Sequence, residues 1–203
     1  MDILTQDRFT SLDVELPLWD RFFMVAPLVV IGTKEKEGYD LAPKHRAMPL
    51  GEGNYFGFIC TPRHGTYQNI KETKAFTVSF PTPDQVVSTS LSASPRRKDI
   101  SKSKGTVEAL PIVKSVNIDA PLLRDAYLYL ECELYKIIDG FDDNSIVTGT
   151  IKAAHVQNEY LRISEKDEGQ QLHNNPLLAY IANGRFAKIT ETYHFPFPKD
   201  FKK

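Results

Sequence analysis

The sequence predicts a mainly β protein, an antiparallel barrel decorated by a few helices. Short stretches rich in β-branched and aromatic residues follow one another along much of the chain. The segments with helical character are few and short, and they do not alternate regularly with the strands. A doubly wound parallel sheet requires that alternation, so the sequence disfavours it.

The composition fits one folded domain. The chain has 203 residues, the length of a single domain, and 41% of them are hydrophobic. Twelve Phe, nine Tyr and one Trp argue against intrinsic disorder. The sequence shows no repeat and no linker that would divide it. We therefore expect residues 1–24 to be an N-terminal extension and residues 25–203 to be one domain.

Charge and hydropathy exclude several classes of protein. The 25 Lys and Arg residues balance 26 Asp and Glu residues, which disfavours a nucleic-acid-binding protein. The longest apolar run, residues 22–31, is too short to cross a bilayer, which takes about 20 residues. The N-terminus lacks the pattern of a signal peptide, and two cysteines fit a reducing compartment. We expect a cytoplasmic protein with no membrane or nucleic-acid partner.

Strands are predicted in both halves of the chain. In the first half they cover residues 27–33, 39–42, 55–60 and 75–80. The first of these is apolar on both faces, which predicts burial on both sides. Residues 127–135 alternate between apolar and polar side chains, so one face should be buried and the other wet. A turn at 139–144 and a return strand at 146–156 complete a long hairpin.

Helices are expected over residues 18–23, 66–73, 82–93 and 175–181, and a last strand over residues 185–189. The helix at residue 82 has the clearest start signal. Thr82 suits the N-cap, Pro83 the first helical position, and Gln85 completes a capping box.

Common catalytic motifs are absent from the sequence. It contains no dinucleotide fingerprint, no P-loop and no nucleophile elbow. Its five histidines include no pair at the spacing of a helical metal site, so we expect no metal. Cys60 and Cys132 both fall on predicted strands, where a small core residue is a simpler interpretation than a nucleophile.

The informative block covers residues 40–69. Its basic and hydroxyl candidates are Lys44, His45, Arg46, Thr61, Arg63, His64 and Thr66. The last three stand at a predicted helix start, whose amide groups lack internal partners and bind anions. The block predicts a cradle for a phosphorylated, planar cofactor, and an ordinary helix cap with surface charges is the alternative. Residues 96–104 are a second basic stretch, either a phosphate grip or a solvated loop.

A series of motifs supports a closer identification. In chain order they are PLVVIGT (27–33), YDLAP (39–43), YFGF (55–58), HGTYQNI (64–70), NPLLAY (175–180) and GRF (184–186). Their order and spacing resemble the flavin reductase-like family, whose members bind FMN on a split β-barrel. Gly65 stands where that family has an acidic residue, and basic residues replace a hydroxyl in the loop after Pro43. Charge-assisted bonds from such residues hold a phosphate strongly.

The resemblance implies specific site residues. Thr66 and Asn69 would lie at the phosphate end of FMN, and Lys44, His45 and Arg46 would form the phosphate-contacting loop. Thr61 and Arg63 would follow the strand beside the flavin ring. His64 and Arg185 are candidates for stabilising negative charge on the reduced flavin.

The resemblance also implies a function and partners. It implies a homodimer that binds FMN near the subunit interface and reduces flavin by hydride transfer from NADH or NADPH. A partner oxygenase or another electron acceptor would then receive the electrons. The flavin carries the redox chemistry, so no acid–base dyad is needed. Two alternatives remain open: an FMN-binding electron carrier without NAD(P)H activity, and a split-barrel binding protein that has lost flavin.

Overall fold

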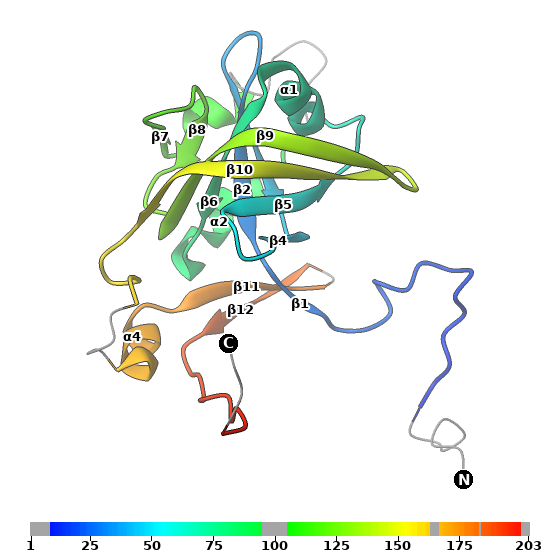
Figure 1. The fold of residues 1–203 in the computed structure, drawn as a ribbon, viewed down its shortest axis with the longest axis vertical. Coiled ribbons are helices and arrows are strands. Elements are labelled where there is room, and N and C mark those ends of the chain that lie inside the picture. The colour runs from blue at the N-terminus through cyan, green and yellow to red at the C-terminus, as the bar shows by residue number, and fades with distance from the viewer. Residues whose placement is uncertain (1–8, 95–104, 163–166, 183, 200–203) are drawn as a thin grey trace.

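The computed structural model describes residues 9–94, 105–162, 167–182 and 184–199, and Figure 1 shows its fold. The strands are β1 (Val25–Pro27), β2 (Val29–Lys34), β3 (Tyr39–Lys44), β4 (Ala47–Pro49), β5 (Tyr55–Cys60), β6 (Ala75–Phe80), β7 (Ile112–Lys114), β8 (Pro121–Leu123), β9 (Leu128–Phe141), β10 (Asn144–Val156), β11 (Leu177–Ile181) and β12 (Arg185–Ile189). The helices are α1 (Gly65–Thr73), α2 (Val86–Leu91) and α4 (Glu168–Asn174), with 3-10 turns η2 (Pro83–Gln85) and η3 (Val107–Ala109). Within these ranges no helix is long and apolar enough to span a membrane.

A seven-stranded sheet forms the body of the molecule, in the order β3-β2-β6-β9-β10-β5-β4. Each of its pairings is antiparallel, which confirms the predicted fold class. Its two edge strands, β3 and β4, are joined by only His45 and Arg46. Three residue steps span at most about 11 Å, so the sheet must curl until its edges approach. No ladder joins β3 to β4 in the described chain, so the barrel has an open seam there.

The inside of the barrel is an apolar core. Phe56, Phe58 and Phe76 are its largest buried rings, and Phe58 meets Phe76 edge-on with ring centroids 5.4 Å apart. Tyr67 and Ile70 of α1 join this core beside β2 and β3. Alternate residues of β2 point to opposite faces, so Val29 and Ile31 join this core while Val30 joins a second one. The predicted burial of this strand on both sides is confirmed.

The second core lies under a lobe of residues 105–126, which includes η3, β7 and β8. Val107, Leu110 and Leu123 of the lobe pack with Val30 and Leu41 on the outer face of the large sheet. Figure 1 shows this lobe beside the barrel, at the left of the view. The lobe therefore converts one outer face of the sheet into a buried interface.

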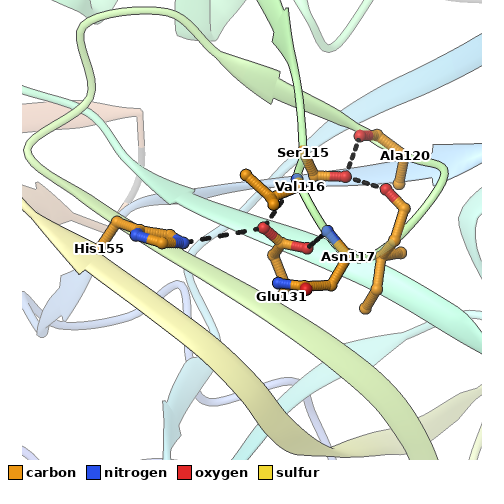
Figure 2. A network of polar contacts seen from close by, with 7 residues as sticks. Ser115, Val116, Asn117, Ala120, Glu131 and His155 are labelled. Carbon is orange, nitrogen blue, oxygen red and sulfur yellow. Dashed lines mark hydrogen bonds and ion pairs between the residues drawn. The ribbon is translucent and has the colours of Figure 1, made fainter.

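Glu131 corrects the prediction that alternate residues of β9 are wet. Its side chain is fully buried beneath the lobe. Its carboxylate accepts the amide N–H groups of Val116 at 3.0 Å and Asn117 at 2.6 Å, as Figure 2 shows. His155 Nε2 lies 3.9 Å from the same carboxylate. A buried charge is tolerated when it is hydrogen-bonded in this way.

The terminal sheet is the three-stranded unit β1-β11-β12, which lies beneath the barrel in Figure 1. The helix predicted over residues 175–181 is wrong, because β11 occupies this segment and pairs with β1 and β12 on its two sides. Pro176 has no amide N–H and disfavours helix at the residue before it, so α4 ends at Asn174. The strand predicted over residues 185–189 is confirmed as β12.

The remaining helix predictions differ in outcome. Residues 18–23 form turns rather than a helix, and the expected helix there is wrong. The segment from Pro83 is helical only to Leu91, as η2 followed by α2. Gln85 Oε1 accepts the Thr82 amide N–H at 3.0 Å, which confirms the capping box. The predicted hairpin is confirmed as β9 and β10, with a tighter turn than residues 139–144 suggested.

Candidate functional site

A cavity of about 310 Å³ lies at the barrel seam, and we call it the seam pocket. Four parts of the chain line it: the β3–β4 turn, the end of β5 with the residues that follow, the start of β10 at Asn144, and the terminal sheet with the segment before it. Among the residues predicted for the site, Lys44, His45, Arg46, Thr61 and His64 all line this pocket. They meet there because the turn and the end of β5 both flank the seam, and Ile59 N–H donates to Arg46 O at 2.9 Å.

The other predicted residues lie elsewhere. Thr66 is only 2% exposed, and its hydroxyl donates to Asp40 Oδ2 at 3.4 Å. Asn69 donates to Thr33 Oγ1 at 2.9 Å, so both side chains face β2 and β3 rather than the seam pocket. Arg185 is exposed on β12 and does not line it. The basic stretch of residues 96–104 lies outside the described residues.

Arg63 belongs to a neighbouring cavity of about 360 Å³. The two cavities share Thr61 and Asn144, whose side chains are hydrogen-bonded at 3.3 Å. Arg63 Nη1 lies 3.5 Å from Asp143 Oδ2 at the tip of the β9–β10 hairpin. This second cavity therefore continues the seam pocket toward an acidic hairpin end.

Helix α1 begins beside both cavities. Its N-cap is His64, no side chain caps it, and its first turn carries no acidic residue. The amide groups at its start are thus free of competition from an acidic side chain. A helix start with neighbouring cations suits an anionic group such as a phosphate.

Two of the ionisable side chains that line the seam pocket, His45 and Cys60, have shifted pKa values with different consequences. Burial, together with the positive charges of Arg46 and Lys44, lowers the pKa of His45, so its imidazole is neutral at pH 7. Burial raises the pKa of the Cys60 thiol, which is 2% exposed and packs in the apolar core. A protonated, buried thiol is a poor nucleophile. The interpretation of Cys60 as a core residue is confirmed.

Cys132 is also a core residue. It is fully buried, and burial followed by the nearby Glu131 charge raises the pKa of its thiol to about 12. It lies in the same apolar cluster as Cys60.

Sequence reasoning missed the wall opposite the basic turn. Tyr180 of β11 stacks on His45, with ring centroids 4.4 Å apart and planes 24° from parallel. Trp19, Asp20 and Met24 line the same pocket from the segment before β1. Tyr180 belongs to the NPLLAY motif, so the sequence did mark this segment as part of the family resemblance. Because the motif was predicted to be helical, the sequence did not predict that Tyr180 packs on His45.

These residues fit a phosphorylated, planar ligand. Lys44, Arg46 and the start of α1 supply charged and amide donors, and His45 with Tyr180 supplies flat aromatic surface. The cavity lies at the lower end of the range of about 300–1,000 Å³ for small-molecule pockets. The cavity around Arg63 extends the available space.

Comparisons with known proteins identify the family and the fold of the chain. The family model described as "Flavin reductase like domain" matches residues 21–188. The crystal structure of the 2-nitrobenzoate 2-nitroreductase NbaA from Pseudomonas fluorescens is similar, with a TM-score of 0.71 and 22% identity. The match covers 88% of this chain and 87% of NbaA.

Two further crystal structures extend over nearly the whole chain. Flavoredoxin from Methanosarcina acetivorans has a TM-score of 0.72 and 20% identity, covering 95% of this chain and 97% of flavoredoxin. An FMN-binding protein from Thermus thermophilus, with 1-cyclohex-2-enone bound, has a TM-score of 0.74 and 19% identity, covering 92% and 99%. At these identities the likeness establishes the fold, which is the split barrel.

Proposed function

The chain belongs to the flavin reductase-like family, and from that premise we propose that the seam pocket binds FMN and that the protein reduces flavin with NADH or NADPH. One observation carries the proposal: four basic side chains, Thr61 and an aromatic wall line a single cavity at the seam. The FMN-binding protein from Thermus thermophilus has the same fold, which supports the choice of FMN.

Each group of residues has a distinct part in this proposal. Lys44 and Arg46 bind the phosphate by charge-assisted hydrogen bonds, aided by the amide groups at the start of α1. The rings of His45 and Tyr180 exclude water from one side of the pocket. His64 adds a donor that can carry positive charge where negative charge develops. Bound FMN would supply the ring that accepts a hydride and passes on electrons.

We also propose a homodimer and an acceptor for the reduced flavin. Large apolar side chains are exposed on the wall of the barrel, among them Met48 of β4, Tyr55 of β5 and Tyr135 of β9. Tyr55 and Tyr135 pair with ring centroids 5.0 Å apart, so the patch is contiguous across the strands. Such patches favour a partner surface, and a second copy of the chain is our candidate. A partner oxygenase would receive the reduced flavin.

The likeness to flavoredoxin favours a second candidate function. An electron carrier would use the same FMN site but would take electrons from a protein rather than from NADH or NADPH. A barrel without flavin is the third possibility, and the experiment below separates all three.

The experiment is a visible absorption spectrum, recorded as purified and after adding FMN followed by gel filtration. We expect flavin bands that persist through the column. NADH or NADPH is then added without oxygen, and rapid bleaching supports the reductase. Retained FMN without bleaching favours the electron carrier. A protein that retains no flavin contradicts the proposed site.

A variant sharpens the residue assignment. Replacing both Lys44 and Arg46 by Ala should weaken FMN binding by about 100-fold or more, because each of the two charge-assisted hydrogen bonds contributes roughly 1.5–3 kcal/mol. Titration of FMN fluorescence measures the affinity. Arg185→Ala is the matched control, since Arg185 is equally basic but does not line the pocket. Equal losses in both variants would contradict the assignment of the basic turn to the phosphate.

A further inference from the structure

We propose that Tyr180 is a positioning residue for the flavin site, which holds the basic β3–β4 turn in place through its stack on His45. The inference rests on the proposed function of the seam pocket and adds a residue to it. The two rings lie 4.4 Å apart between centroids and 24° from parallel, and both line the pocket. Aromatic pairs with this geometry stabilise each other beyond the area they bury.

Tyr180 is itself firmly fixed. It lies in the central strand of the terminal sheet, where it pairs with Ala26 of β1 and Phe186 of β12. Its hydroxyl oxygen accepts the amide N–H of Gly184 at 2.9 Å. Gly184 has a φ of +75°, a conformation that glycine adopts without strain, in the turn between β11 and β12. The ring is therefore a rigid platform for whatever packs on it.

The two-residue turn that packs on this platform lies between paired strand residues, since Lys44 pairs with Val29 of β2 and Ala47 pairs with Phe58 of β5. His45 and Arg46 join the two edge strands of the barrel, and the described residues form no ladder across that seam. On one side Arg46 O accepts the Ile59 amide N–H. On the other side His45 rests on Tyr180. The stack thus adds a ring contact between the turn and the terminal sheet, where β1 and β4 also meet, and it directs the flanking Lys44 and Arg46 side chains.

The lowered pKa of His45 gives a way to observe this role. The titratable groups that line the pocket around it are Asp20, Lys44, Arg46, Cys60, His64 and Tyr180. Burial is the main cause that lowers the pKa of His45, followed by Arg46 and Lys44. Removing the Tyr180 ring would admit water to one face of the imidazole, so the pKa of His45 should rise toward its ordinary value of about 6.5. A purely structural role for Tyr180 elsewhere would not move that pKa.

The test compares Tyr180→Ala and Tyr180→Phe with Tyr193→Ala, a control at a tyrosine that is 83% exposed. FMN affinity is measured by fluorescence titration, and the His45 titration by NMR on protein without flavin, with His45→Gln used to assign the signal. We expect Tyr180→Ala to bind FMN roughly tenfold more weakly, the loss that an aromatic pair would give. Its His45 pKa should rise. Tyr180→Phe loses the hydroxyl bond to Gly184 but keeps the ring and its strand pairing, so both readouts should lie much closer to those of the natural protein than to those of Tyr180→Ala.

The outcomes separate this inference from the proposed function. Unchanged FMN affinity or an unchanged His45 pKa in Tyr180→Ala overturns the positioning role. A natural protein that binds no FMN overturns the proposed function, and the NMR titration still decides whether Tyr180 controls His45. If circular dichroism shows that Tyr180→Ala is unfolded, Tyr180→Leu takes its place, because leucine fills the space without offering a ring face.

Discussion

The lobe of residues 105–126 and the terminal sheet both pack against the same barrel, but they do so differently. The lobe packs on the sheet through a buried apolar cluster. Side chains of the sheet also bond to the backbone of the lobe, as where Ser79 Oγ of β6 accepts the Leu123 amide N–H at 3.0 Å. The terminal sheet leaves cavities where it contacts the barrel. The seam pocket and an apolar cavity of about 200 Å³ beside Phe80 and Tyr127 are both lined by its residues.

We interpret the difference as a division of roles, in which the lobe stabilises the fold and the terminal sheet forms part of the proposed binding site. A close-packed interface tolerates no ligand, and each change in it costs folding free energy. A contact with cavities costs less to alter and leaves room for a cofactor and its substrate. We therefore expect mutations under the lobe to change stability without changing FMN affinity, and mutations at the terminal sheet to do the reverse.

The largest effect is expected at Gly32 of β2. A Cβ atom there would lie 2.0 Å from Pro121 O and 2.4 Å from Thr77 Oγ1, so Gly32→Ala must push the lobe off the sheet. We expect a loss of about 3 kcal/mol or more in the free energy of unfolding, measured by urea denaturation. FMN affinity of the folded fraction should stay within about twofold, a difference of about 0.4 kcal/mol.

Gly53→Ala is the matched control for this change. Its Cβ would lie 3.1 Å from the ring of Tyr55, which can move. A similar loss of stability in both glycine variants would mean that the close approach of Pro121 does not govern the lobe. A large loss of FMN affinity in folded Gly32→Ala would contradict the separation of the stabilising lobe from the binding site.

Glu131 provides the next largest effect. Glu131→Ala removes a fully buried carboxylate together with its hydrogen bonds to the amide groups of Val116 and Asn117, which should cost about 2–3 kcal/mol of stability. Glu133, two residues along β9, is exposed and pairs with Lys152 at 3.3 Å. Glu133→Ala should cost less than about 0.5 kcal/mol, as surface ion pairs usually do. Equal midpoints of urea unfolding for the two variants would contradict the role of Glu131.

Much of the barrel could be predicted from local pattern. β2 is a short run that is apolar on both faces, and the β9–β10 hairpin is long and largely periodic. Each has a pairing partner that follows it closely in sequence. Glu131 could not be predicted as buried, because the lobe that covers it contributes strands of only three residues and no periodicity. The sequence predicts a helix where β11 lies, because the conformation of β11 depends on its partners, β1 and β12, and β1 lies far away in sequence.

The site was predicted in part for a related reason. Lys44, His45, Arg46, Thr61 and His64 lie in the two loops that flank the seam, so placing β3 and β5 also placed these residues. Thr66 and Asn69 lie three residues apart and share one face of α1, and that face packs on β2 and β3. Tyr180 and Trp19 reach the pocket only through the packing of the terminal sheet and the segment before it, which no local pattern encodes.

The smallest predicted effect is a pH dependence of the free energy of unfolding, caused by His45 at its contact with the terminal sheet. His45 has a lowered pKa in the folded protein, so its neutral form stabilises the fold at pH values above the unfolded pKa of about 6.5. That contribution is lost as the pH falls below this value toward the lowered folded pKa. The effect should be small, because His45 is only partly buried and water screens its charge.

FMN affinity should depend on pH in the opposite direction to fold stability, and this opposition makes the effect testable. A bound phosphate favours the charged imidazole, so the complex takes up a proton and the affinity attributable to His45 rises as the pH falls. Urea unfolding and FMN titration between pH 8 and 5.5 are compared for the natural protein and His45→Gln. The difference between the two proteins removes the contributions of the other four histidines and of the phosphate itself. Identical pH profiles for both proteins would mean that the charged form of His45 neither destabilises the fold nor lies close enough to the bound phosphate to be stabilised by it.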